Sequence, residues 1–268
     1  TTWGSPSWIS GGEGGCPAGG LLPAKALDLL TRDSLFSGKL LIYQGKKGYR
    51  FSIDAVLLAG LAAVKPGDRV VELGSGCGVV LLILAFRGLG ESLVGVEIQH
   101  DLFSLARRNA RENGLEGRVR FLEADYREVS TVLPPQSCDV VLSNPPYRRL
   151  HSGRVNPDSQ RAIARHELAA TLPDLFRAAD YLLPEGGRMG VIYPSTRLES
   201  LVVAAHEAGF RPKELTLIFS YPASPARLIH MHLTKGGGEE LNVSPPFFIY
   251  ERPGEYSVDM KRLYEARD

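Results

Sequence analysis

Residues 69–86 read RVVELGSGCGVVLLILAF, and this stretch decides the fold. The first five residues form a short apolar run typical of a buried parallel strand, and the last eight predict an apolar helix. A glycine-rich turn, Gly74 to Gly78, joins the strand directly to the helix. Such a turn lets a ligand approach the backbone and points amide N–H groups at it. The alternative is that the glycines serve only the packing of the helix on the strand.

Three classes of cofactor site use turns of this kind. A P-loop requires Gly-Lys-Ser/Thr at its end, and Gly78-Val79-Val80 excludes it. The dinucleotide fingerprint requires a third glycine where Val79 stands, so that interpretation is weakened. The remaining pattern is Glu-x-Gly-x-Gly-x-Gly from Glu72 to Gly78, which is typical of S-adenosylmethionine (SAM) sites in seven-stranded methyltransferases.

Acidic residues stand at the ends of the next two predicted strands. Strand 92–96 ends in Glu97, about twenty residues beyond the turn, where a carboxylate could accept from both hydroxyls of a ribose. Strand 119–122 is followed by Glu123-Ala124-Asp125-Tyr126. There Asp125 could accept from an adenine amino group while an apolar or aromatic neighbour covers the ring. The alternative for Glu97 and Asp125 is a solvated loop carboxylate.

A fourth apolar strand, residues 139–143, leads into Asn144-Pro145-Pro146-Tyr147. The two prolines end the strand because neither can donate to the ladder. An amide oxygen and a free carbonyl can together accept both hydrogens of a planar amino group, and the tyrosine ring can stack on whatever carries that group. This indicates an exocyclic amine on an adenine, guanine or cytosine, or a carboxamide. The alternative is a tight Asn-Pro turn that only closes the strand.

Strands and helices alternate along the rest of the chain, which predicts an α/β fold with helices on both faces of a mostly parallel sheet. Residues 1–20 are predicted to be a flexible glycine-rich tail, 21–64 an N-terminal extension packing on the active site, and 65–268 the main domain. Further strands are expected at 40–44, 188–193, 214–220 and 228–234, and helices at 21–30, 53–63, 101–112, 159–183 with a break at Pro173, and 196–208.

The composition favours a cytoplasmic protein. No apolar run is long enough to span a membrane, and no basic-then-apolar leader precedes a cleavage site. The three cysteines, at positions 16, 77 and 138, have no metal-ligand spacing and suit a reducing compartment, so no metal is expected. His230 and His232 alternate on a predicted strand and are interpreted as structural.

The order of these motifs resembles the class I amino-group methyltransferases, which include N6-adenine enzymes and release-factor glutamine methyltransferases. Residues 43–59, 153–157 and 162–167 narrow the resemblance to the bacterial tRNA1(Val) (adenine(37)-N6)-methyltransferase family. The similarity runs from about residue 35 to the end of the chain, and includes Lys235-Gly236-Gly237, Pro245-Pro246 and Gly254-Glu255-Tyr256.

The resemblance implies a Rossmann-like seven-stranded class I methyltransferase fold, in the strand order 3-2-1-4-5-7-6 with an antiparallel last strand. It implies SAM as cofactor and methyl transfer to the N6 amino group of adenine in RNA, above all tRNA. The catalytic residues would be Asn144, Pro145, Pro146 and Tyr147. The cofactor would be bound by Phe51, Ser52, Asp54, Glu72, Gly74, Ser75, Gly76, Gly78, Glu97, Ile98, Ala124, Asp125, Tyr126 and Asn144. For Ser52, a helix N-cap is the alternative role.

The net charge of +1 is small for an RNA-binding protein, but basic residues cluster near the predicted site. Five arginines and two histidines fall between residues 144 and 166, against Asp158 alone. The predicted contacts to RNA phosphates are Lys46, Lys47, Arg50, Arg148, Arg149, Arg154 and Arg165. The alternative is a solvated loop and an ordinary arginine-bearing helix face.

Three other functions stay open. One is a protein glutamine N5-methyltransferase of the release-factor type, which would use the same motif on a carboxamide. Another is an amino-methyltransferase with a different RNA target. The third is a SAM-dependent RNA-binding module without catalysis, although such a protein would not need Asn144 and Tyr147. The oligomeric state is left open.

Overall fold

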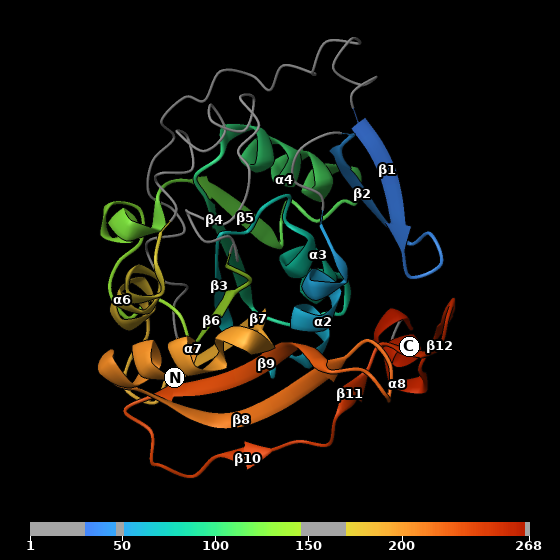
Figure 1. The fold of residues 1–268 in the computed structure, drawn as a ribbon. Coiled ribbons are helices and arrows are strands. Elements are labelled where there is room, and N and C mark those ends of the chain that lie inside the picture. Colours follow the sequence, from blue (N-terminus) through green and yellow to red (C-terminus); the bar gives the residue numbers. More distant parts are fainter. Residues whose placement is uncertain (1–29, 47–50, 146–169, 266–268) are drawn as a thin grey trace, which may run out of the picture.

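The structure, a computed structural model, describes residues 30–46, 51–145 and 170–265 (Figure 1). Several predicted site residues lie outside these ranges: Pro146, Tyr147, Lys47, Arg50, Arg148, Arg149, Arg154 and Arg165. The predicted tail 1–20 lies outside them as well. The predicted domain boundaries at residues 20 and 64 stay a prediction.

A central sheet in the order β10-β8-β9-β7-β6-β3-β4-β5 organises the described part of the chain, with β11 also paired to β8. Strands β5, β4, β3, β6 and β7 are parallel, whereas β9 is antiparallel to both of its neighbours, β7 and β8. Numbered along the chain as seven strands, this is the predicted order 3-2-1-4-5-7-6. The α/β Rossmann-like class I fold is therefore confirmed. The strands are β3 Arg69–Leu73, β4 Ser92–Glu97, β5 Val119–Glu123, β6 Val140–Ser143, β7 Arg188–Pro194, β8 Phe210–Phe219, β9 Ala226–Lys235, β10 Asn242–Val243 and β11 Phe247–Phe248.

Helices cover both faces of the sheet because the central strands are apolar on both sides. Val70 and Leu142 belong to the hydrophobic cluster that contains α2 (Ile53–Leu61), α3 (Val79–Phe86) and α4 (His100–Glu112). Val71 and Val141 point into the second cluster, which contains α6 (Leu172–Leu182) and α7 (Leu198–Glu207). The alternation of neighbouring residues between the two clusters follows the two-residue period of a strand.

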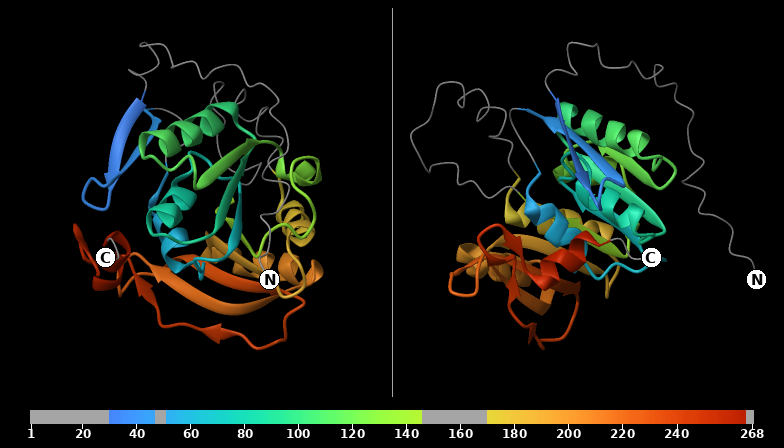
Figure 2. Two further views of the ribbon diagram at one scale, coloured as in Figure 1. Left: turned by 180° about the vertical axis from the view of Figure 1, so that it is seen from behind. Right: turned by 90° about the vertical axis from the view of Figure 1, so that its right-hand side faces the viewer.

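The chain between residues 30 and 45 forms a hairpin that stands beside α4 in all views (Figures 1 and 2). Strand β1 (Leu30–Leu35) pairs antiparallel with β2 (Leu40–Gly45) and with no strand of the central sheet. The predicted helix 21–30 is wrong at Leu30, the only residue of that range that the structure describes. In the turn of the hairpin, Phe36 has a positive φ of 52°, and its ring stacks on Phe86 at the end of α3 with centroids 4.8 Å apart.

The helix predicted for residues 159–183 needs one correction. In the described range, α6 begins only at Leu172, and Thr171 caps it in a capping box with Asp174. Pro173 therefore lies in the first turn and breaks nothing, since a residue there has no intrahelical acceptor for an N–H. The predicted helix 196–208 is present as a short 3-10 turn, η3 (Ser195–Arg197), followed by α7.

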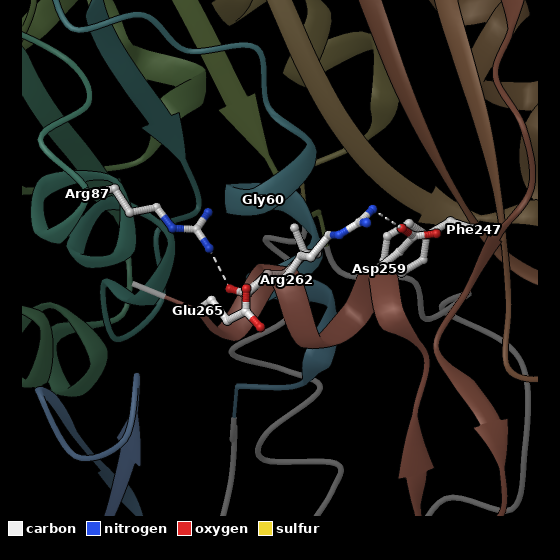
Figure 3. Close-up of a pocket in the computed structure, with 7 residues that line it drawn as sticks. Gly60, Arg87, Phe247, Asp259, Arg262 and Glu265 are labelled. Atoms are coloured by element: carbon white, nitrogen blue, oxygen red, sulfur yellow. Dashed lines mark hydrogen bonds and ion pairs between the residues drawn. The ribbon is translucent and has the colours of Figure 1, made fainter. Parts of the chain in front are cut away.

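The last described residues form elements that the sequence analysis did not predict: β12 (Tyr250–Arg252), β13 (Glu255–Tyr256) and α8 (Val258–Tyr264). Helix α8 returns to α2 and α3, where Arg87 donates to the Leu263 carbonyl at 2.5 Å. A pocket lies beside this contact, lined by residues such as Gly60, Arg87, Phe247 and Arg262 (Figure 3). None of the predicted site residues within the described ranges lines it.

Neither a membrane span nor a metal cluster is found in residues 30–46, 51–145 and 170–265. No helix of that part has the length and apolar character needed to cross a bilayer. No group of three or more His, Cys, Asp or Glu side chains is arranged there to hold a metal ion.

Candidate active site

The predicted site residues meet at the carboxyl edge of the sheet because the strands are in register there. Glu72 pairs with Leu142, Leu73 with Val96, and Glu97 with Glu123. Asn144 therefore leaves β6 beside Gly74, where the glycine loop leaves β3. The Ser143 hydroxyl fixes this arrangement by donating to the Leu73 carbonyl at 2.9 Å. Open α/β sheets bind their ligands at this edge.

The loop between β3 and α3 needs its glycines. Gly74, Gly76 and Gly78 have positive φ values of 77°, 55° and 85°, which residues with a Cβ rarely adopt. A Cβ at Gly78 would also lie 2.6 Å from the ring of Phe121. At Gly74, in contrast, an added Cβ would meet nothing within 4 Å, so the backbone there can be approached.

The prediction that the loop directs its amides at a ligand is wrong for four of them. Gly74 N–H and Ser75 N–H both donate to the Val96 carbonyl, at 2.9 and 3.1 Å. Gly76 N–H donates to Glu97 Oε2 at 2.8 Å, and Gly78 N–H to the Ser75 carbonyl at 2.9 Å. These four donors are thus used within the protein, and the Cα of Gly74 is the part of the loop that a ligand can approach.

Two carboxyl groups are buried beside the loop, and they differ in their partners. Glu97 is 4% exposed, and its oxygens accept from Gly76 N–H and from Gln99 N–H at 2.8 and 2.9 Å. Burial raises the pKa of Glu97, and these hydrogen bonds partly oppose that rise. Glu72 is 2% exposed, and its Oε2 has no hydrogen-bond partner among the described residues. Burial, with the charge of Glu97 added, raises the pKa of Glu72 well above its usual value.

These carboxyl groups fit a ligand that carries hydrogen-bond donors. The hydroxyl oxygen of Ser75 is a second buried atom without a partner in the described part of the chain. A buried polar atom without a partner is costly, and a ligand that bonds to it removes that cost. An ammonium group and a pair of ribose hydroxyls, as in SAM, are donors of the required kind. Each oxygen of Glu97 keeps a second lone pair for such a hydroxyl.

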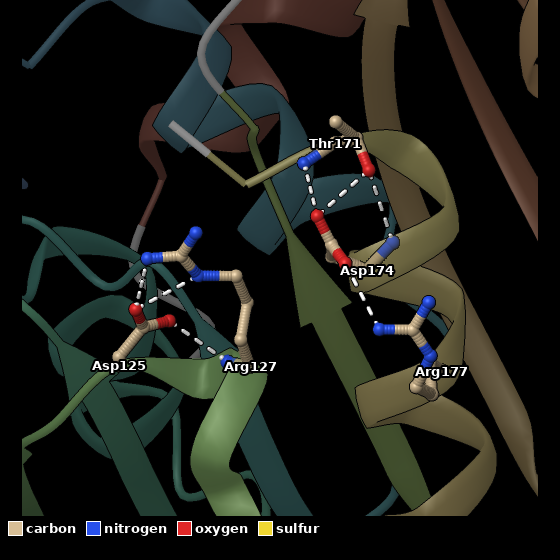
Figure 4. Close-up of polar contacts among 5 residues, drawn as sticks. All are labelled: Asp125, Arg127, Thr171, Asp174 and Arg177. Atoms are coloured by element: carbon tan, nitrogen blue, oxygen red, sulfur yellow. Dashed lines mark hydrogen bonds and ion pairs between the residues drawn. The ribbon is translucent and has the colours of Figure 1, made fainter. Parts of the chain in front are cut away.

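Asp125, at the end of β5, already has a protein partner (Figure 4). Its carboxylate accepts from Arg127 N–H at 2.9 Å and pairs with the Arg127 guanidinium at 2.5 Å. Burial would raise the pKa of Asp125, but the hydrogen bonds from Arg127 outweigh burial and lower it. A ligand amino group at Asp125 would have to share the carboxylate with Arg127.

Apolar surface for a flat ring is present between Glu97 and Asp125. Ile98 is 46% exposed, and Ala124 is half-buried. Ala124 N–H donates to the Glu97 carbonyl at 3.0 Å, which holds the ends of β4 and β5 together. Tyr126 is half-buried against the cluster beneath α6.

The predicted residues before α2 have structural partners. Ser52 caps α2, with its hydroxyl accepting from Asp54 N–H at 3.3 Å, so its N-cap role is confirmed. Phe51 N–H donates to the side chain of Gln44 at 3.0 Å. Lys46 is exposed at the end of the hairpin.

The structure thus brings Asn144, Gly74, Glu97, Ile98 and Asp125 to one edge. Sequence reasoning missed three residues that support this edge: Gln44, Asn109 and Arg127. Only Asn109 gave a usable signal, because it falls on the apolar face of α4 with Leu102, Leu105 and Ala106, where a polar side chain needs a partner.

Comparisons with known proteins give one consistent picture. The family described as a methyltransferase domain matches residues 64–217. The tRNA1(Val) (adenine(37)-N6)-methyltransferase of Porphyromonas gingivalis is 29% identical over 228 residues, which cover 81% of this chain and 87% of that relative. The protein of the same name from Parabacteroides distasonis is 27% identical over 198 residues, covering 73% and 81%.

Two solved structures share the fold. The crystal structure of a predicted O-methyltransferase from Agrobacterium tumefaciens matches with a TM-score of 0.64 and 24% identity, over 80% of this chain and 98% of the other. TYW2 from P. horikoshii, solved in complex with MeSAdo, matches with a TM-score of 0.54 and 16% identity, over 78% and 73%.

Proposed function

The chain belongs to the methyltransferase-domain family, and on that premise we propose that it transfers a methyl group from SAM to the N6 amino group of an adenine in tRNA. One observation carries the proposal more than any other. Asn144 and Pro145 leave β6 level with Gly74, so the Asn144 amide and the Pro145 carbonyl stand beside the loop assigned to the cofactor.

The proposed cofactor site combines three features. Glu97 and Glu72 supply acceptors for the ribose hydroxyls and the ammonium group, Gly74 leaves the backbone open, and Ile98 covers the adenine. When bound, SAM supplies a methyl group on a positively charged sulfur. Phe51, Ser52 and Asp54 are proposed to approach its methionine end.

The acceptor chemistry follows from the properties of an aromatic amine. Its lone pair is delocalised into the ring, so the nitrogen is a poor nucleophile. When the Asn144 side chain and the Pro145 carbonyl accept both hydrogens, they favour a pyramidal nitrogen and stabilise the positive charge that develops on it. No general base is needed before attack, because the proton leaves more easily once the nitrogen carries the methyl group. Tyr147 is proposed to stack on the target base after that base has left its own stack.

The names of the relatives support tRNA as the substrate. Lys46, Lys47, Arg50, Arg148, Arg149, Arg154 and Arg165 are the proposed phosphate contacts. Such contacts would make tRNA binding weaken steeply with salt. A cytoplasmic location is proposed because that is where a tRNA substrate is found.

The test is methyl transfer from labelled SAM to separate tRNA, rRNA and protein fractions, with the product identified as a nucleoside or an amino acid. We expect N6-methyladenine in tRNA. Asn144→Ala should lower turnover about 100- to 1000-fold, as expected when a contact that stabilises developing charge is lost. The affinity for SAM should change less than about threefold, since Asn144 serves the acceptor.

Two results would count against this function. Methylglutamine in the protein fraction, with unlabelled tRNA, would favour the release-factor type of enzyme instead. Near-normal turnover by Asn144→Ala would remove the assigned role of the motif.

A further inference from the structure

The β1–β2 hairpin is attached to α4 by side-chain amides that take the place of a neighbouring strand. Asn113 accepts from Leu41 N–H at 2.8 Å and donates to the Leu41 carbonyl at 2.7 Å. Asn109, one turn earlier, does the same at Tyr43, at 2.7 and 3.0 Å. The Arg108 guanidinium also lies over the Tyr43 ring, 4.2 Å from its centroid. These contacts hold β2 against the C-terminal end of α4.

Asn109 makes one bond that Asn113 does not. Its amide also donates to the Cys77 carbonyl at 3.0 Å, inside the glycine-rich loop. Asn109 is 0% exposed, so no water competes for these bonds. A single side chain therefore ties the hairpin to the loop.

The hairpin reaches the start of α2 through Gln44. This side chain is 2% exposed, accepts from Phe51 N–H at 3.0 Å and donates to Asp33 on the other strand of the hairpin. Phe51 directly precedes Ser52, the cap of α2. The hairpin is thus connected to the glycine-rich loop through Asn109 and to the segment before α2 through Gln44.

We propose that the hairpin braces the cofactor site, with Gln44 and Asn109 as positioning residues that fix residues 51–54 relative to the glycine-rich loop. This inference rests on the proposed function, because both segments are assigned to SAM. Neither side chain would touch the cofactor: Asn109 acts through the backbone of Cys77, and Gln44 through that of Phe51. Binding geometry has to be held within about half an ångström, which favours such supporting hydrogen bonds.

The test compares SAM binding, measured by calorimetry, with the free energy of unfolding in urea. Gln44→Met keeps the length of the side chain and removes both of its hydrogen bonds. Asn109→Ala removes the tie to the loop. Asn113→Ala is the matched control, since it loses the same pair of bonds to the hairpin and no bond to the loop.

We expect Gln44→Met and Asn109→Ala to weaken SAM binding about tenfold, the effect of losing one or two hydrogen bonds. In turnover assays the KM for SAM should rise while kcat stays near its original value. Asn113→Ala should lower stability but keep SAM affinity within about twofold. Gln44→Met decides the question alone if Asn109→Ala does not fold.

A rescue variant separates positioning from general stability. In Asp33→Asn combined with Gln44→Glu, the new amide at position 33 donates to the new carboxylate at position 44, which still accepts from Phe51 N–H. The number of charges is unchanged. We expect the SAM affinity lost in Gln44→Met to be recovered in this double variant, to within about threefold of that of the unaltered protein.

The brace is overturned if Gln44→Met and Asn109→Ala bind SAM as tightly as the unaltered protein. It is also overturned if Asn113→Ala weakens binding as much as Asn109→Ala. A different result would contradict the proposed function: the unaltered protein would bind SAM but methylate no tRNA. In that case the binding data would still decide the question of the brace.

Discussion

Glu72 is a buried carboxyl group for which we propose a role in binding. Its carboxyl group is buried at 2% exposure, and one of its oxygens has no hydrogen-bond partner within the described part of the chain. A protein keeps such a group when something outside the chain completes its hydrogen bonds. For Glu72, the ammonium group of SAM is the proposed partner.

The first prediction concerns Glu72→Gln. Burial raises the pKa of Glu72 in the folded protein. A carboxyl group with a raised folded-state pKa lowers stability as pH rises above its unfolded-state value, about 4.3. Without cofactor, Glu72→Gln should therefore be more stable than the unaltered protein at pH 7, and this difference should disappear as the pH falls to about 4. Urea unfolding between pH 4 and 8 measures it.

The same substitution should weaken SAM binding, because a neutral amide attracts an ammonium group less than a carboxylate does. Equal stability of the two proteins at pH 7 would show that Glu72 meets a partner within the folded chain. Glu123→Gln is the control, since Glu123 is exposed and forms its ion pair with His100 at 3.0 Å.

At the scale of elements, the ring of Phe121 determines how β5, β4 and α3 fit together. A Cβ on Gly95 of β4 would lie 2.6 Å from this ring and 2.7 Å from Ser75 Oγ. A Cβ on Gly78, at the start of α3, would lie 2.6 Å from the same ring. Two glycines on different elements thus make room for one phenylalanine, which is itself 7% exposed.

The second prediction follows from this packing. Gly95→Ala should lower the free energy of unfolding by about 1–3 kcal/mol, the usual cost of overpacking a core. Gly117→Ala is the matched control: its Cβ would meet nothing within 4 Å, and its stability should change by less than about 0.5 kcal/mol.

Combining Gly95→Ala with Phe121→Leu should recover part of the loss, because the smaller side chain vacates the space. A double-mutant cycle in urea measures this coupling. Strict additivity would mean that the Phe121 ring is not the obstacle.

At the scale of the whole molecule, four stacked tyrosines connect the end of β8 to the last helix of the described chain. Tyr221 follows β8, Tyr250 and Tyr256 face each other in the β12–β13 hairpin, and Tyr264 ends α8. Neighbouring ring centroids lie 5.5, 5.2 and 5.4 Å apart. The stack attaches residues 250–264 to the end of β8. Helix α8, at the end of the stack, also contacts α3 through the hydrogen bond from Arg87 to the Leu263 carbonyl.

The third prediction uses the position of each ring in this stack. Tyr256→Ala removes two ring pairs and should cost about 1–3 kcal/mol beyond the area it exposes, at about 0.5–1.5 kcal/mol per pair. Tyr221→Ala removes one pair and should cost about half as much. Urea unfolding measures both losses of unfolding free energy. Equal losses would mean that stability does not depend on the number of ring pairs removed.

The centre of the fold could be predicted from the sequence because its signals are local. Residues 69–73 and 79–86 are strand and helix as predicted, since a continuous apolar run and a glycine turn need no distant partner to be interpreted. Strand β1, with the sequence LTRDSL, lacks the alternation of a half-buried strand. It is held by its pairing with β2, which no local pattern reveals.

The site divides in the same way. The position of Glu97 and Asn144 at one edge of the sheet is predictable because each stands at the end of a strand, and the parallel sheet brings strand ends together. Their roles in binding and catalysis stay predictions. Gln44 and Arg127 could not be predicted, because their roles depend on which backbone amide or carboxylate lies opposite them in space. The use of the loop amides within the protein was missed for the same reason: their acceptors, such as Val96, lie on a neighbouring strand.

The asparagine contacts of the hairpin also bear on solubility. A two-stranded sheet normally exposes backbone donors and acceptors along both outer edges, and such an edge can recruit strands from other molecules and aggregate. On β2 that edge is occupied at Leu41 and Tyr43, because the side-chain amides of Asn109 in α4 and of Asn113, its C-cap, bond to the N–H and the carbonyl of both residues. Helix α4 therefore shields the hairpin from intermolecular strand pairing along β2, without a further strand in the fold.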